Sequence, residues 1–242
     1  MPPPAGSGGY NTGMPNVLAI ETSTELASVA LLYENRVLSC ESSGVQTHSQ
    51  SVLPMIRQLL DEAGIAMSAC DAIAFGAGPG SFTGVRTACG IAQGLGFGAN
   101  RPLLPVVTLL AMAEACRAQT GSEDVIALLD ARMDEIYWAQ YRVIDGNWQA
   151  VSEPALSAPA AVRLEAPATL CGNGLPLLRA AGLVPGGMAI REGIMPHAVQ
   201  VAQLGAADLA RNLAVDAAHA QPLYVRNKVA LTTDERLARS RA

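Results

Sequence analysis

The feature of this sequence that most constrains the fold is an internal repeat. Segment 17–42 is typical of an apolar strand, a polar turn, a second strand, a tight turn and a third strand, and segment 125–152 has the same order. Glu21 and Asp130 occupy matching positions, because each closes the first apolar strand of its segment. A duplicated unit of this kind predicts two related lobes. Since identity between the halves is low, two unrelated α/β segments are the alternative.

The connecting segments predict how each strand unit continues. Apolar residues at helical spacing predict a helix over 48–63, and a second helix is expected over 81–98. An apolar strand at 71–78 precedes that second helix, and another at 102–107 follows it. Residues 168–182 repeat the order of apolar strand, Gly-x-Gly and helix in the second half. Antiparallel strands followed by crossover helices indicate an α/β fold.

Changes in composition along the chain predict its boundaries. An Ala/Leu-rich helix is expected over 199–217, and it is free to pack back on the first lobe. We divide the chain into a flexible Pro/Gly/Ser-rich leader (1–15), a first lobe (16–107), a second lobe (108–220) and an extended tail (221–242).

Composition and charge argue against several classes of protein. Half of the 242 residues are hydrophobic and 15% are charged, which is typical of a globular chain. A formal net charge of −5 argues against independent nucleic-acid binding, which needs a basic face. The five cysteines and three histidines lack the spacing of a metal site. No apolar run is long enough to span a bilayer and no signal peptide is recognisable, so we expect a cytoplasmic protein with mostly buried thiols.

The stretch AGPGSFTGVR, residues 77–86, has the appearance of a phosphate loop. It is neither a Walker A loop nor a G-x-G-x-x-G loop, because its spacing fits neither motif and the lysine is missing. A glycine turn at Gly78 and Gly80 is followed by Ser81 or Thr83 as the helix cap. The free N–H groups of that helix could hold an anion, or the cap could stand without any ligand.

The two polar turns offer candidate catalytic groups. Residues 21–24, ETST, suit either the remnant of a phosphate site or an ordinary turn whose hydroxyls bond the backbone. The second turn holds Asp130, Arg132, Asp134 and Glu135. These carboxylates could serve acid–base or metal chemistry, but on a hairpin they usually form a solvated ion-pair cluster with the arginine. No Ser–His–Asp order or Cys–His pairing emerges, so no catalytic residue is predicted.

Glycines recur at every fourth position in the second predicted helix. Gly90, Gly94 and Gly98 follow Arg86 at this spacing, and each interior glycine costs a helix about 1 kcal/mol relative to alanine. The stripe predicts that another backbone approaches this side of the helix. The neighbour is the chain's own sheet, the helix that starts near His48, or another subunit.

Several motifs in chain order together resemble the TsaB family, the dimerisation subunits of the bacterial machinery that makes threonylcarbamoyladenosine beside the tRNA anticodon. The resemblance covers residues 17–232 and rests on LAIETSTELASVAL, HSQSVLPMI, AFGAGPGSFTGVR, LLDARMDEIYW and PLYVRNKVA. It implies an α/β fold of the actin-like ATPase (ribonuclease H-like) type, with two similar lobes that each have a mixed sheet flanked by helices.

The resemblance also implies a role without catalysis. Members of this family pair with TsaD, which transfers threonylcarbamoyl to tRNA, and work with the ATPase TsaE. They form homodimers when alone and meet tRNA only through the complex. Thr108 and Met112 stand where TsaD has its two metal-binding histidines, so no metal is expected. No cofactor is implied for the chain alone, although ATP or ADP could lie at the interface. The alternative is an ATP-binding or ATP-hydrolysing enzyme of the actin or sugar-kinase type.

Two sets of residues follow from this resemblance. The first set forms the partner interface: His48, Ser49, Gln50, Val52, Leu53 and Ile56 on the first helix, and Phe82, Thr83, Arg86, Gly90 and Gly94 on the second. The second set is the vestige of a nucleotide site: Glu21, Thr22, Ser23, Thr24, Gly78, Gly80 and Ser81. The family commonly has aspartate where this chain has Glu21, which weakens the expectation that the chain binds nucleotide by itself.

Overall fold

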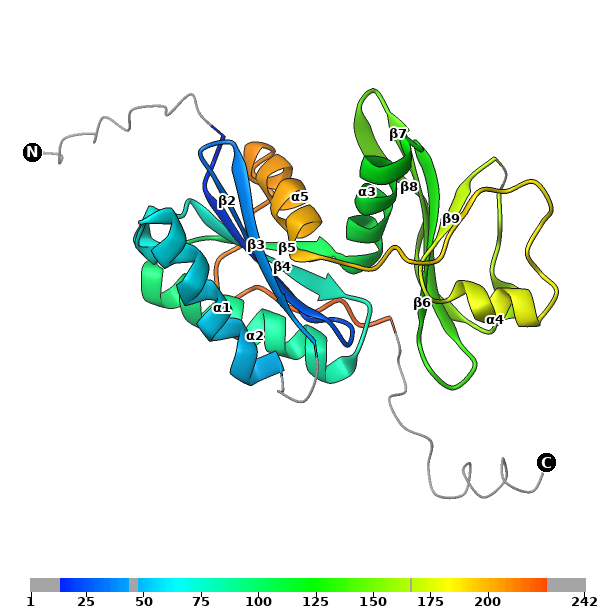
Figure 1. Ribbon diagram of the computed structural model, residues 1–242, viewed down its shortest axis with the longest axis horizontal. Helices are drawn as coiled ribbons and strands as arrows, with labels where there is room; N and C mark the ends of the chain where they lie inside the picture. The colour runs from blue at the N-terminus through cyan, green and yellow to red at the C-terminus, as the bar shows by residue number, and fades with distance from the viewer. Residues whose placement is uncertain (1–13, 44–47, 166, 226–242) are drawn as a thin grey trace, which may run out of the picture.

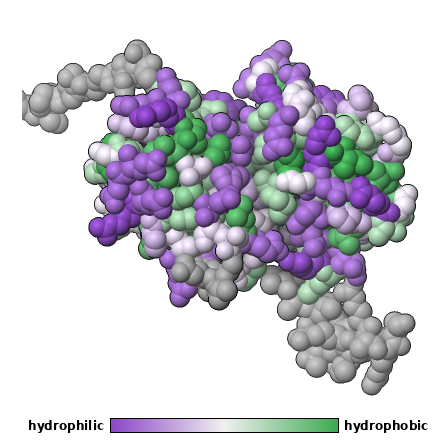
Figure 2. All heavy atoms as spheres, viewed as in Figure 1, coloured by the Kyte–Doolittle hydropathy of each residue, from purple (hydrophilic) through white to green (hydrophobic). Residues whose placement is uncertain are grey.

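The computed structural model describes residues 14–43, 48–165 and 167–225. Nearly all of the predicted leader and the tail beyond residue 225 therefore lie outside the described residues. Within the described part, no helix is long and apolar enough to cross a membrane. Hydrophilic and hydrophobic side chains are interspersed over the face seen in Figure 2.

The first lobe is built on a five-stranded mixed sheet of order β3-β2-β1-β4-β5 (Figure 1). The central strand β1 pairs antiparallel with β2 and parallel with β4, and all five of its residues are buried. The strands are β1 (Val17–Glu21), β2 (Ala27–Tyr33), β3 (Arg36–Ser42), β4 (Ala72–Gly78) and β5 (Leu103–Val107).

The second lobe repeats this topology. Its sheet has the order β10-β9-β6-β7-β8, which matches the first sheet strand for strand when it is followed from β8. The predicted duplication is therefore confirmed, and Glu21 and Asp130 each end the first strand of their sheet. The strands are β6 (Asp124–Asp130), β7 (Ile136–Ile144), β8 (Asn147–Ser157), β9 (Thr169–Cys171) and β10 (Ile190–Arg191).

Helices cover the faces of the sheets. In the first lobe, α1 and α2 pack on one face, and α5 packs on the opposite face against β1, β2 and β4 (Figure 1). The helix α3 packs against β6, and α4 lies beside the same strand. The helices are α1 (His48–Ala63), η1 (Met67–Ala69), α2 (Phe82–Ala99), α3 (Thr108–Thr120), η2 (Pro159–Ala161), α4 (Leu175–Ala180) and α5 (Ala198–Ala210).

One predicted helix is shorter than its composition indicates. The expected helix 199–217 is α5, which ends at Ala210. Asn212 has a left-handed φ of 58°, and the N–H of Leu213 bonds the carbonyl of Asp208, which is the pattern of a helix C-terminal cap. The chain then turns back, so that Val215 pairs with Leu103 at the start of β5. The prediction was wrong because alanine content does not reveal where the backbone leaves the helix.

Candidate functional site

The carboxylate of Glu21 is sealed inside the first lobe. It is completely buried, its Oε1 accepts the N–H of Ser23 at 2.6 Å, and Thr108 Oγ1 donates to its Oε2 at 3.4 Å. Burial raises the pKa of Glu21, and these hydrogen bonds offset part of the rise. A Cβ at Gly76 would lie 1.9 Å from Oε2, so only glycine leaves room for the carboxylate there. Glu21 thus holds the hairpin turn in place from within the core.

The hairpin turn of residues 21–24 is joined tightly to the start of α2. Thr22 Oγ1 donates to the carbonyl of Gly84 at 2.7 Å, and the N–H of Ser81 bonds the carbonyl of Ser23 at 2.7 Å. A Cβ at Gly80 would come within 2.6 Å of Ser23, and one at Gly84 within 1.9 Å of the Thr22 carbonyl oxygen. These two glycines are therefore required for packing, whether or not an anion binds.

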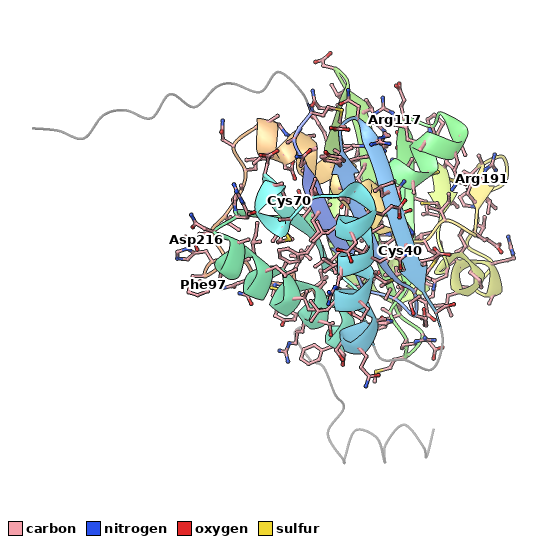
Figure 3. All side chains as sticks on the ribbon, turned by 60° about the vertical axis from the view of Figure 1, so that its left-hand side comes forward. Cys40, Cys70, Phe97, Arg117, Arg191 and Asp216 are labelled. Atoms are coloured by element: carbon pink, nitrogen blue, oxygen red, sulfur yellow. The ribbon has the colours of Figure 1, made fainter. Side chains whose placement is uncertain are left out.

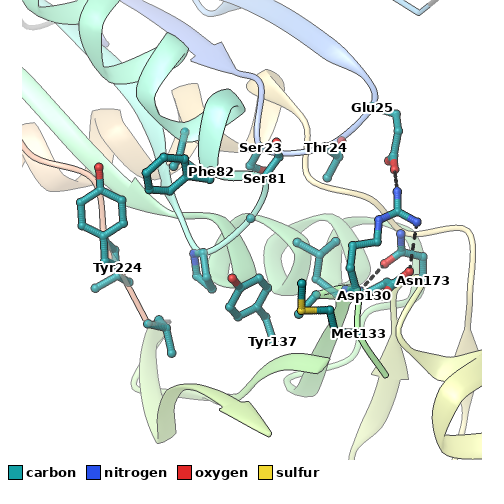
Figure 4. Close-up of a pocket in the computed structure, with 18 of the residues that line it drawn as sticks. Ser23, Thr24, Glu25, Ser81, Phe82, Asp130, Met133, Tyr137, Asn173 and Tyr224 are labelled. Atoms are coloured by element: carbon teal, nitrogen blue, oxygen red, sulfur yellow. Dashed lines mark hydrogen bonds and ion pairs between the residues drawn. The ribbon is translucent and has the colours of Figure 1, made fainter. Parts of the chain in front are cut away.

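The structure distinguishes the two candidate helix caps. Ser81 is the N-cap of α2, and its hydroxyl accepts the N–H of Gly84 at 3.4 Å. Thr83 is exposed in the first turn, where its carbonyl accepts the hydroxyl of Thr87. The N-terminus of α2 opens toward the gap between the lobes, next to the turn that holds Ser23 (Figure 4).

A cavity of about 560 Å³ lies between the lobes. It takes its walls from both hairpin turns, the start of α2 and residues 223–225 (Figure 4). Of the predicted nucleotide-site vestige, the residues that line the cavity are Ser23, Thr24, Gly80 and Ser81, while Glu21, Thr22 and Gly78 do not. Aromatic side chains from three segments, Phe82, Tyr137 and Tyr224, also line it.

The acidic turn of the second lobe closes one side of this cavity. Arg132 forms an ion pair with Glu25 of the other lobe and a second, at 3.5 Å, with Asp130 (Figure 4). The backbone N–H of Asp130 bonds the Asn173 side chain at 2.8 Å. Both members of the Glu25–Arg132 pair are about 70% exposed. Of the ion-pair cluster that the sequence predicted, the pair between Asp130 and Arg132 is present, and Arg132 has Glu25 as its second partner. Among the described residues, no group of three or more His, Cys, Asp or Glu side chains could hold a metal ion.

The two positions at which the resemblance implies that metal ligands are missing are closed to solvent. Thr108 and Met112 are fully buried on α3. The Thr108 hydroxyl accepts the N–H of Gly78 at 3.2 Å while it donates to Glu21. Thr108 therefore connects the glycine turn, the hairpin carboxylate and α3 within the core.

The second candidate site is the exposed face of α1 and α2, called here the two-helix face. The two helices lie side by side, and Phe97 projects outward at the end of α2 (Figure 3). Large apolar side chains on these helices are exposed: Leu53 to 50%, Phe82 to 38% and Phe97 to 86%. The predicted interface residues with exposed side chains or backbone are Ser49, Gln50, Leu53, Phe82, Thr83, Arg86, Gly90 and Gly94, and His48 is half-buried.

Two of the predicted interface residues do not lie on the exposed surface. Val52 and Ile56 are buried and belong to the hydrophobic core beneath α1. They lie one turn apart, so they share the helix side that packs on the sheet, and Leu53 points the other way. Val52 and Ile56 support the two-helix face from inside and are not available to a partner.

The glycine stripe lies on the outside of the protein. A Cβ added at Gly90, Gly94 or Gly98 would meet no atom of the described residues within 4 Å. Gly96 is different, because its added Cβ would come within 2.7 Å of the Leu103 side chain. Within the described chain, neither the sheet nor α1 approaches the stripe, so these two of the three predicted neighbours are excluded there.

Tyr224 contacts the start of α2, and the sequence did not reveal this contact. Its hydroxyl accepts the Nε–H of Arg86 at 2.7 Å, and the N–H of the preceding Leu223 bonds the carbonyl of Ala77 at 2.7 Å. The guanidinium carbon of Arg86 lies 3.7 Å from the centre of the Phe82 ring and 5.5 Å from that of Tyr224. A separation of 138 positions hides this contact from any local pattern.

Comparison with known proteins decides the family. The tRNA threonylcarbamoyladenosine biosynthesis protein TsaB of Escherichia coli (strain K12) is 36% identical over 222 residues, which are 88% of this chain and 96% of that protein. The chain belongs to the TsaB family. The TsaB protein of Haemophilus influenzae is 48% identical over 124 residues, 51% of this chain and 52% of that protein. The family model of TsaD, tRNA N6-adenosine threonylcarbamoyltransferase, matches residues 42–174.

Solved structures agree with membership of the TsaB family. YeaZ from Pseudomonas aeruginosa is 42% identical, covers 87% of this chain and 100% of its own, and superposes with a TM-score of 0.81. A second Pseudomonas aeruginosa structure, described as similar to peptidase YEAZ, has the same identity over 88% of this chain, with a TM-score of 0.82. Together with the two matching sheets, these structures confirm the expected actin-like α/β fold with two similar lobes.

Proposed function

We propose that this chain acts in tRNA threonylcarbamoyladenosine biosynthesis as a non-catalytic subunit that binds TsaD through the two-helix face. In this role it supports the transfer of threonylcarbamoyl by TsaD, together with TsaE, in the cytoplasm. Family membership supports the process, because the curated relatives are named for it. The match of the TsaD family model to residues 42–174 supports a partner with a related fold.

The exposed glycine stripe is the observation that carries this proposal. Three helix-weakening residues on one open side of α2 gain nothing for the isolated chain, since no described atom approaches them. Their absent side chains let a partner helix approach closely, and the exposed Leu53, Phe82 and Phe97 supply apolar surface around them. A partner with similar helices fits such a face, and in its absence a second copy of this chain would occupy it.

The hairpin of the first lobe supports a role without catalysis. The acid at the end of β1, Glu21, is buried, bonded to Ser23 and Thr108, and absent from the cavity wall. A carboxylate in that position cannot reach a nucleotide-bound metal in the cavity without rearrangement of the turn. The reaction chemistry is assigned to TsaD, and a bound ATP or ADP, if the complex holds one, to the interface.

Binding to TsaD is tested with a substitution that fills the stripe. Gly94→Leu is expected to abolish coelution with TsaD in size-exclusion chromatography and to reduce tRNA modification by the reconstituted system. Gly193→Leu is the matched control, because Gly193 is exposed in the second lobe and its added Cβ also meets nothing within 4 Å. Equal complex formation by the Gly94→Leu variant and the wild type would refute the two-helix interface.

The cavity between the lobes favours a second candidate, an ATP-binding or ATP-hydrolysing enzyme. Its volume of about 560 Å³ and its hydroxyl groups from Ser23, Thr24 and Ser81 suit a small polar ligand. Calorimetric titration of the chain alone with ATP and Mg²⁺ separates the two functions. Binding that is lost in Asp130→Asn would favour the enzyme, and absence of binding with intact TsaD association would favour the subunit.

A further inference from the structure

Arg86 is a cation that is fixed in place and has no acidic partner among the described residues. Its Nε donates to the hydroxyl of Tyr224, and the Phe82 ring lies beneath its guanidinium. No carboxylate of the described residues forms an ion pair with it, whereas Arg132 and Arg142 each have such partners. The two terminal nitrogens of Arg86 therefore have unused donors in the described part of the chain.

Phe82 and Tyr224 hold the Arg86 guanidinium in one orientation, which favours binding of an anion. A free arginine loses about 2 kcal/mol of rotamer entropy when it is held in one geometry, and Phe82 and Tyr224 have already restricted this side chain. The terminal edge of a guanidinium matches a carboxylate, which accepts two parallel hydrogen bonds from it. A phosphate accepts the same pair of hydrogen bonds, so the missing group is an anion of one of these two kinds.

The position of Arg86 favours a protein as the source of that anion. Phe82 and Tyr224 line the cavity between the lobes, but Arg86 does not. Arg86 is exposed, and Gly90 lies one helical turn further along α2 on the same side. Arg86 therefore shares one side of α2 with the glycine stripe and is not part of the cavity lining.

We propose that Arg86 determines partner specificity by binding a carboxylate side chain of TsaD, and that Tyr224 is the positioning residue that holds Arg86 for this contact. The segment that carries Leu223 and Tyr224 then forms part of the two-helix face, although it lies far from α1 and α2 in sequence. This inference rests on the proposed function.

The test measures affinity for purified TsaD by calorimetry for full-length variants. Arg86→Gln is expected to weaken binding at least about tenfold, because a charged hydrogen-bonded pair is lost. Arg86→Lys is expected to bind more tightly than Arg86→Gln but more weakly than the wild type. Lysine keeps the charge but lacks the two parallel N–H donors of the planar guanidinium. Tyr224→Phe retains the ring but removes the hydroxyl, and a loss of about threefold is expected. Arg179→Gln, which removes an exposed charge that pairs with Glu192 in the second lobe, is the control for loss of a surface arginine.

The salt dependence of TsaD affinity distinguishes a charged contact of Arg86 from a purely structural role of this residue. The difference between the wild type and Arg86→Gln is expected to shrink as NaCl rises from about 0.05 M to about 0.5 M, because screening weakens the ion pair. Thermal unfolding of each variant checks the fold, and Arg86→Lys and Tyr224→Phe provide the test if Arg86→Gln does not fold.

The outcomes separate this inference from the proposed function. If TsaD binds the wild type, and Arg86→Gln behaves like Arg179→Gln, the role of Arg86 is refuted and the subunit function stands. If Arg86→Gln instead loses binding of inorganic phosphate or ATP to the isolated chain while TsaD binding is unchanged, the group recognised is a phosphate, which also overturns the inference. Failure of the wild type to bind TsaD refutes both.

Discussion

Thr22 and Gly84 are 62 positions apart, yet the hydroxyl of Thr22 bonds the carbonyl of Gly84 at 2.7 Å in a buried contact. The backbones are so close that a Cβ at Gly84 would lie 1.9 Å from the carbonyl oxygen of Thr22. This contact joins the first hairpin turn to the start of α2.

Gly84→Ala is therefore expected to destabilise the isolated chain by about 2–3 kcal/mol, because backbone atoms must move to admit the methyl group. Gly90→Ala is the control in the same helix. It is expected to stabilise the chain by about 0.5–1 kcal/mol, since its site is open and alanine favours helix. Urea unfolding at concentrations where the chain is monomeric measures both. Equal effects of the two substitutions would contradict the packing described here.

The raised pKa of Glu21 predicts how stability depends on pH. A carboxyl group whose folded pKa exceeds its ordinary value of 4.5 binds more protons in the folded state, so its contribution to stability falls as pH rises from 4.5 through the folded pKa. Glu21→Gln is expected to remove this decline and to leave the variant at least as stable as the wild type at neutral pH. Unfolding midpoints measured between pH 4.5 and 8 check it, and identical pH profiles for the two proteins would refute it.

The ion pair between Glu25 and Arg132 is expected to add little stability, although it bridges the lobes. Both side chains are about 70% exposed, so water screens their attraction. A double-mutant cycle with Glu25→Gln and Arg132→Gln is expected to give a coupling energy below about 1 kcal/mol. A larger coupling in urea unfolding would show that the pair holds the lobes together.

The left-handed backbone conformation of Asn212, just after α5, can be tested by substitution. Asn212 has a φ of 58°, which glycine adopts freely and a β-branched residue does not. Asn212→Gly is expected to be neutral or stabilising, and Asn212→Val to cost about 1 kcal/mol or more. Thermal unfolding monitored by circular dichroism measures the difference. Equal melting temperatures for the two variants would contradict the left-handed conformation.

The sequence by itself determined most of the strands and helices and the duplication, because apolar periodicity and turn residues act over short distances. It did not predict α3, which follows β5 without a break. It predicted α1 from 48 to 63 without error, and it located Glu21 and Asp130 at equivalent strand ends. The close neighbour that the glycine pattern on α2 predicts is not found among the described residues and stays a prediction.

Only the tertiary structure decided which side of each element meets which neighbour. It placed Val52 and Ile56 in the core, left Gly90 and Gly94 open, and brought Tyr224 onto Arg86. These outcomes depend on contacts between segments far apart in the chain, and such contacts form only when the sheets and helices pack. A local pattern contains the spacing of residues but not the identity of the surface that they face.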